Sequence, residues 1–109
     1  MFVLRRKDDN RLFSLGNDEQ SVSFICHDRK TAEKAVRQVR ETYAVECVAE
    51  KADPSEISGF WFLAYRNGRK YGPESGVSVV CCNQSVAAYC AGNLRETIRK
   101  IVKPIPVCV

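Results

Sequence analysis

This chain of 109 residues lacks long apolar runs. No stretch approaches the roughly 20 consecutive apolar residues that a membrane-spanning helix needs, so we expect no membrane insertion. The first residues, MFVLRRKDDN, bring charges soon after a short apolar start and lack the apolar core of a signal peptide. We therefore expect a cytoplasmic protein in a reducing, intracellular environment, whose six cysteines are free thiols.

The residues and motifs of catalysis are also scarce. His27 is the only histidine, and the chain contains no G-x-S-x-G nucleophile elbow, no H-E-x-x-H zinc motif and no glycine-rich phosphate loop with its lysine. No pair of residues is marked as an acid and a base. These absences predict a protein that is not an enzyme and that holds no cofactor.

Two pairs of adjacent residues are of the types that bind metal ions. Cys26-His27 and Cys81-Cys82 stand at equivalent strand ends, and their convergence would offer four ligands that zinc accepts. Adjacent residues of a strand point to opposite faces, which disfavours joint ligation, so we predict no metal site. A reactive thiol at Cys26 or Cys81 is an alternative, but small buried hydrophobes are the more ordinary role of such cysteines.

What the chain does contain is an internal similarity. Residues 21–42 align without a gap with residues 76–97, and seven of the aligned pairs are identical. Average residue usage predicts about one or two identities by chance. The identical pairs are Val22/Val77, Ser23/Ser78, Cys26/Cys81, Ala32/Ala87, Arg40/Arg95, Glu41/Glu96 and Thr42/Thr97. The pattern predicts a duplication, with one pseudo-repeat at 1–50 and the other at 59–109. A chain of this length forms a single core, so we expect one domain, 1–109.

Each pseudo-repeat is predicted to fold as strand-strand-strand-helix-strand. Alternating apolar residues precede an amphipathic segment in both copies, where Asp28 in the first and Asn83 or Ser85 in the second can cap the helix. Asn67-Gly68 predicts a two-residue hairpin turn. The fold class is therefore α+β, with one mostly antiparallel sheet of about seven or eight strands and two helices on one face.

The last strand of each copy is expected at a cysteine. Residues 45–48 (VECV) align with residues 107–109 (VCV), which makes the segment with Pro104 and Pro106 a longer linker in the second copy.

The segment Gly59–Tyr65 (GFWFLAY) is apolar on both faces of a strand and carries the leading functional hypothesis. If both helices cover one face, part of this segment must lie on the other, where an apolar patch would mark a protein contact. We predict a protein-interaction or assembly module whose open sheet face binds a protein partner or a second copy. The predicted partner-binding residues are Phe60, Trp61, Phe62 and Tyr65, with Trp61 and Tyr65 as anchors. The alternative is a sheet curled enough to bury both sets.

Single-stranded nucleic-acid binding is the second functional hypothesis. The net charge of +4 is mild, but basic residues flank both predicted hairpin turns. They are Arg5, Arg6, Lys7 and Arg11 in the first copy and Arg66, Arg69 and Lys70 in the second. Phe13, Tyr65 and Tyr71 lie nearby and are able to stack on unpaired bases. The sequence leaves both hypotheses open.

Overall fold

The computed structural model describes residues 1–16, 21–98 and 102–107, without the side chains of 96–98. It has one antiparallel sheet of seven strands with three helices, so the predicted α+β class is confirmed. The elements in chain order are β1 (Phe2–Arg6), β2 (Ser14–Leu15), β3 (Val22–Cys26), α1 (Arg29–Tyr43), β4 (Cys47–Lys51), α2 (Pro54–Ile57), β5 (Trp61–Tyr65), β6 (Val77–Cys81), α3 (Gln84–Ile98) and β7 (Val102–Pro106). The strand order is β4-β1-β3-β6-β5-β7, with β2 paired to β3.

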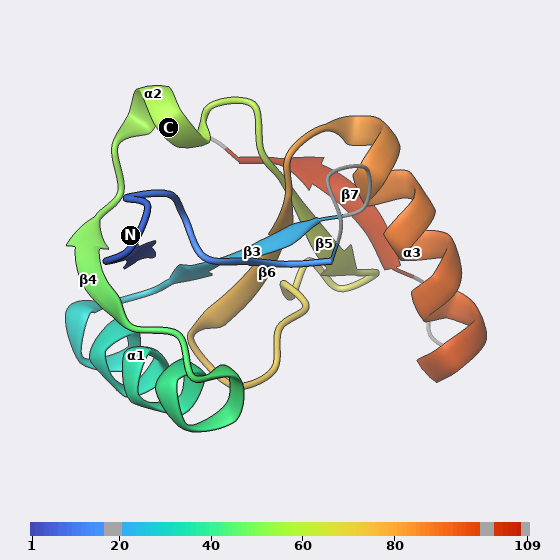
Figure 1. Cartoon of the computed structure of the whole chain (residues 1–109). Coiled ribbons are helices and arrows are strands. Elements are labelled where there is room, and N and C mark those ends of the chain that lie inside the picture. Colours follow the sequence, from blue (N-terminus) through green and yellow to red (C-terminus); the bar gives the residue numbers. More distant parts are fainter. Residues whose placement is uncertain (17–20, 99–101, 108–109) are drawn as a thin grey trace.

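The two long helices cover the same face of the sheet, as predicted. Ala32, Ala35 and Val39 of α1 pack on one half of the sheet, while Ala87 and Ala91 of α3 pack on the other half. Figure 1 shows α1 and α3 beside opposite ends of the sheet. None of the described helices combines the length and the apolar character that crossing a membrane requires.

Both helices begin at the caps that the sequence indicates. The side chain of Asp28 accepts a hydrogen bond from the Thr31 N–H at 2.8 Å, and the Asn83 side chain accepts one from the Val86 N–H at 2.9 Å. Each bond satisfies one of the free N–H groups of a first helical turn. Asn83, rather than Ser85, is therefore the cap of α3.

The two halves of the sheet repeat each other in geometry. The central strands β3 and β6 are antiparallel in a register that sets Phe24 opposite Val79, which are aligned residues of the two copies. The Phe13 N–H donates to the Leu4 carbonyl at 2.9 Å, and at the corresponding place the Tyr71 N–H donates to the Leu63 carbonyl at 2.6 Å. An origin by duplication stays a prediction.

The second copy departs from the predicted unit at its last strand. This strand, β7, is Val102–Pro106 and not 107–109; residues 108 and 109 lie outside the described part of the chain. The Val107 N–H donates to the Phe60 carbonyl at 2.9 Å, so the alternate positions Pro104 and Pro106 turn their nitrogens away from β5. The prolines are compatible with a strand because β7 is at the edge of the sheet.

The second hairpin also differs from the prediction. The Tyr65 N–H donates to the Arg69 carbonyl at 2.7 Å and the Gly68 N–H donates to the Tyr65 carbonyl at 2.9 Å, which makes a three-residue loop. Only Gly68 in this loop has a positive φ, 88°, so a two-residue turn with two left-handed positions is wrong. The returning segment makes an isolated bridge between Ala64 and Lys70 in place of a full strand.

The helix-free face of the sheet is partly covered by an element that the sequence did not predict. The short helix α2 begins at Asp53, whose side chain accepts a hydrogen bond from the Ser55 N–H at 3.0 Å. Ile57 of α2 is 1% exposed and packs with Val3, Ile25 and Val80 on this face. The sheet therefore has apolar contacts on both sides, and part of the second side is supplied by the connection between the halves.

Gly72 is predicted to be essential for the fold, because a Cβ at this position would overlap the carbonyl group of Val77 in β6. We expect Gly72→Ala to lower the free energy of unfolding by at least about 3 kcal/mol. The matched control is Gly92→Ala in α3, where a Cβ meets nothing within 4 Å and should raise stability by about 0.5 to 1 kcal/mol. Urea unfolding followed by circular dichroism measures both, and equal effects would contradict this packing.

Candidate functional site

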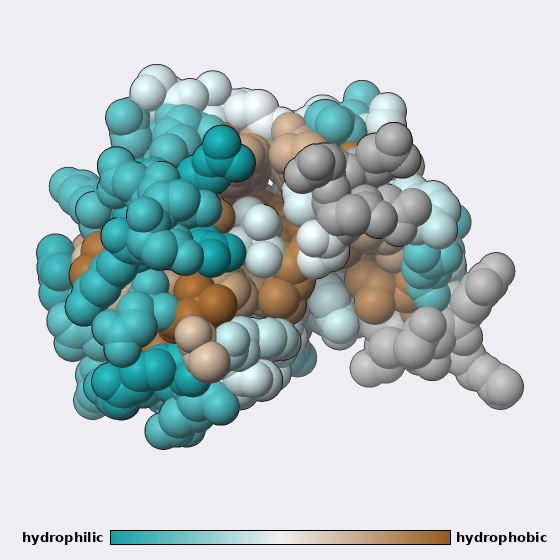
Figure 2. Space-filling view, in the orientation of Figure 1, coloured by the Kyte–Doolittle hydropathy of each residue, from teal (hydrophilic) through white to brown (hydrophobic). Residues whose placement is uncertain are grey.

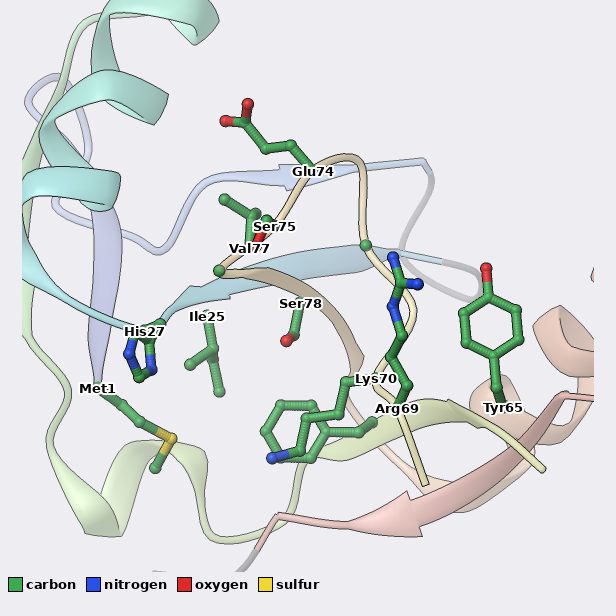
Figure 3. A pocket seen from close by; sticks show the side chains of 13 residues that line it. Met1, Ile25, His27, Tyr65, Arg69, Lys70, Glu74, Ser75, Val77 and Ser78 are labelled. Atoms are coloured by element: carbon green, nitrogen blue, oxygen red, sulfur yellow. The ribbon is translucent and has the colours of Figure 1, made fainter. Parts of the chain in front are cut away.

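A cavity of about 470 Å³ opens on the helix-free face, within the usual range of small-ligand pockets. Ile25 of β3 and Ser78 of β6 are opposite each other in the central register, and both line it. Phe62 of β5 lines it as well. The other lining residues are Met1, His27, Tyr65, Arg69, Lys70, Gly72, Glu74, Ser75, Gly76 and Val77. Both halves of the sheet therefore contribute to one site (Figure 3).

Two cations of the second hairpin lie over aromatic rings at the edge of this cavity. The Nζ atom of Lys70 is 4.5 Å from the ring centroid of Phe62, and the guanidinium carbon of Arg69 is 5.9 Å from that of Tyr65. Both residues are exposed, and neither makes an ion pair with an acidic side chain of the described residues. Their charges are thus available to an anionic ligand.

The local structure explains why Lys70 points into the cavity. The Tyr71 N–H bonds to β5, and the bridge from Lys70 to Ala64 extends the hairpin for one residue. Successive residues of an extended segment point to opposite faces. The Tyr71 ring accordingly packs among the residues under α3, while Lys70 reaches the helix-free face.

Polar groups line the opposite side of the cavity. His27 is exposed, and its backbone N–H donates to the Gly76 carbonyl at 2.7 Å, which holds the loop before β6 against the end of β3. Figure 3 shows His27 and Met1 at one end of the cavity and Arg69 with Lys70 toward the other, with Ser78 between them. The cavity therefore offers two charged side chains at one end and an imidazole and a hydroxyl farther along.

The first hairpin differs from the second because its cations form ion pairs with acidic side chains. Arg5 contacts Glu50 at 2.9 Å and Glu56 at 2.7 Å. Hydrogen bonds to these two carboxylates raise the pKa of Arg5 further above its ordinary value.

The next two cations of the first hairpin also have acidic partners. Arg6 contacts Asp8 at 2.7 Å, and this guanidinium holds the pKa of the Asp8 carboxyl down at about 2. Lys7 contacts Glu46 at 3.5 Å. Arg11, which is exposed on the same hairpin, and Arg66, which is exposed at the second turn, do not line the cavity. Of the seven predicted nucleic-acid contacts, the structure brings only Arg69 and Lys70 together in the cavity.

The four predicted partner-binding residues are divided between the two faces. Trp61 and Tyr65 pack with the residues under α3, because Trp61 pairs in register with Cys81 on that face. Phe60 and Phe62 lie on the helix-free face, where Phe62 is 5% exposed. The expectation that Trp61 anchors the helix-free face is therefore wrong, whereas Tyr65 packs under α3 and also lines the cavity. The sequence does not single out Ile25, Ser78 or His27 as binding residues, although alternation along β3 sets Ile25 on the face opposite to Cys26.

The thiols of Cys26 and Cys81 are buried, and burial suppresses their ionisation. Burial raises the pKa of the Cys26 thiol to about 11 and that of Cys81 to about 12. A high pKa keeps both thiols protonated at neutral pH, which is opposite to the activation that a nucleophilic thiol needs. Within 1–16, 21–98 and 102–107 no cluster of three or more metal-ligating side chains occurs.

No protein-family model matches the chain, and comparisons with curated proteins and with solved structures find no match.

Thiol reactivity should follow burial. At pH 7.5 we expect iodoacetamide to modify the exposed Cys82 at least about tenfold faster than the buried Cys26 and Cys81, because only the thiolate reacts and a raised pKa leaves little of it. Mass spectrometry of digested samples measures each site. In urea the rates should become similar, and fast modification of Cys26 in the folded protein would contradict the burial described above.

Proposed function

We propose that the protein binds single-stranded nucleic acid at the cavity on its helix-free face. The observation that carries this proposal is the placement of Lys70 and Arg69, each over an aromatic ring and without an acidic partner among the described residues. Cations beside aromatic rings are the combination that single-strand binders use, the cations for phosphates and the rings for bases.

The ion pairs of the first hairpin favour the second hairpin as the binding element. For Arg5 or Arg6 to bind a phosphate, the contacts with Glu56 or Asp8 would have to break. Lys70 and Arg69 give up only contacts with rings, which are worth about 0.5 to 1 kcal/mol at exposed sites. Lys70 and Arg69 are therefore the two cations that can bind a phosphate with the least rearrangement.

A movement of Lys70 would also prepare the ring beneath it. Phe62 is 5% exposed, and Lys70 is one of the groups that lie over its face. When the Lys70 ammonium turns toward a phosphate, the ring is uncovered and can stack on an unpaired base, a contact worth about 1 to 3 kcal/mol. A duplex keeps its bases stacked and presents no free base face to Phe62.

Protein binding through Phe60, Trp61, Phe62 and Tyr65 is the other candidate from the sequence. Trp61 and Tyr65 are partly buried under α3, and α2 covers part of the face on which Phe60 and Phe62 lie. These residues form no continuous exposed surface, so no observation favours this candidate over the cavity.

Fluorescence anisotropy with a labelled single-stranded oligonucleotide of mixed sequence tests the proposal. We expect Lys70→Gln to weaken binding about tenfold at low salt, as the loss of one charged hydrogen bond worth about 1.5 kcal/mol predicts. The matched control is Arg37→Gln on the exposed side of α1, which removes the same charge outside the cavity and should change affinity less than twofold.

Salt and duplex measurements complete this test. With two or three phosphates bound, the logarithm of the association constant should fall with the logarithm of salt concentration at a slope of about −1.4 to −2.1. A duplex of the same sequence should bind more weakly. Equal losses in Lys70→Gln and Arg37→Gln, or no binding at low salt, would contradict the proposal.

A further inference from the structure

A second hollow lies on the side of the sheet that α1 covers, between the C-terminal half of α1 and the loop that precedes β6, and Glu74 and Val77 line both hollows. Its volume is about 160 Å³, and we call it the α1 groove. Its lining residues are Leu4, Phe13, Phe24, Ala35, Gln38, Val39, Thr42, Tyr43, Pro73, Glu74 and Val77. Figure 2 shows hydrophobic surface beside α1 near the centre of the view, surrounded by hydrophilic residues.

Glu74 supplies a carboxylate to this apolar groove, and one of its oxygens lacks a partner. Oε1 of Glu74 is buried and has no hydrogen-bond partner among the described residues. Oε2 lies 3.4 Å from Nζ of Lys34, and the side chain as a whole is 29% exposed. Figure 3 shows the carboxylate directed away from the cavity of the helix-free face and toward α1. A buried carboxylate oxygen without a donor is costly, and a ligand that donates to it would remove this cost.

Three aromatic rings surround the space beside this carboxylate. The ring centroid of Phe13 is 5.7 Å from that of Tyr43 and 6.3 Å from that of Phe24. Tyr43 is 48% exposed, so the groove is open to solvent at this ring. Aromatic faces attract cations, and the carbonyl groups at the end of α1 add negative partial charge. The groove therefore suits a ligand with a positive end and an apolar body.

We propose that the α1 groove binds the side chain of a lysine from a protein partner. The methylene stem lies against Phe13, Phe24 and Tyr43, and the ammonium donates to the Glu74 carboxylate. For the bond to Oε1 the carboxylate has to turn toward the groove, because this oxygen is buried in the structure. A cavity of about 150 Å³ holds one molecule of the size of benzene, so 160 Å³ accommodates one side chain and not a larger group.

Lysine fits this groove better than arginine does. A guanidinium binds a carboxylate best through both of its oxygens, but Oε2 of Glu74 faces Lys34. One free oxygen matches the single-point contact of an ammonium. The partner is a protein rather than a free amine, because a small amine gains little from so shallow a contact, whereas the open side at Tyr43 admits a side chain that extends from a larger surface.

Titration by two-dimensional NMR with capped single amino acids tests the proposal. N-acetyl-lysine methylamide should shift the amide signals of Thr42, Tyr43 and Val77 with a dissociation constant in the millimolar range. The norleucine analogue has a similar stem without the charge, and it should bind about fivefold more weakly or not at all. The arginine analogue should also bind more weakly than the lysine analogue. Equal shifts with lysine and norleucine would overturn the proposal.

Three variants locate the charge that is recognised, and their spectra show at the same time whether each variant is folded. Glu74→Gln keeps the shape of the side chain and should remove the preference for lysine over norleucine. Lys34→Met removes the internal competitor and should strengthen lysine binding about threefold. Glu33→Gln, an exposed acid of α1 outside the groove, should change nothing. Unchanged lysine binding in Glu74→Gln, or weaker binding in Lys34→Met, would overturn the proposal.

Self-association and the cavity on the other face provide the remaining tests. Light scattering coupled to size-exclusion chromatography should show no mass increase that depends on Glu74; a dimer that Glu74→Gln dissociates would place the lysine on a second copy and overturn the assignment to another protein. Lys70→Gln should leave the NMR titration unchanged, since Lys70 lines only the cavity of the helix-free face. A loss in that variant would overturn the independence of the two sites.

Discussion

The antiparallel pairing of β3 with β6 is the contact on which the rest of the structure depends. It joins the two halves of the sheet by five residue pairs, with Phe24 opposite Val79 at the centre. Phe24 packs with the clusters under both helices, so one strand pair links two parts of the core. The same pairing places Ile25 beside Ser78 on the other face and so forms the base of the cavity. The core and the cavity thus depend on one register.

The similarity of the halves ends at the connection between them. The segment from β4 to β5 crosses the helix-free face, where α2 buries Ile57 and Glu56 binds Arg5. In the first half, α2 therefore covers part of the sheet, and Glu56 pairs with a cation of the first hairpin. The cavity that both halves line stays open beside the second hairpin, with Lys70 and Arg69 at its edge. Charge pairing and cover therefore differ between the two halves, in addition to the hairpin loops and the last strands.

Local patterns predicted a large part of this fold. The caps at Asp28 and Asn83, the amphipathic helices and the alternating strands depend on neighbours in sequence, and the structure confirms them. The face of the sheet on which Trp61 lies depends on its pairing with Cys81. A strand can include Pro104 because this strand lies at the edge of the sheet. Both features are set by residues that are distant in the sequence. Basic hairpins were visible in the sequence, but which cations would find acidic partners was not. The buried oxygen of Glu74 leaves no signal in the sequence, since it results from tertiary packing alone.

We propose that a single strand enters the cavity formed by both halves and does not bind at the first hairpin. The most direct measurement is a map of backbone amide shifts on addition of a short unlabelled single-stranded oligonucleotide at low salt. Binding in the cavity should concentrate the shifts at His27, Phe62, Lys70 and Ser78. Shifts concentrated instead at the first hairpin, between Arg6 and Arg11, or shifts spread evenly over the basic surface, would contradict it.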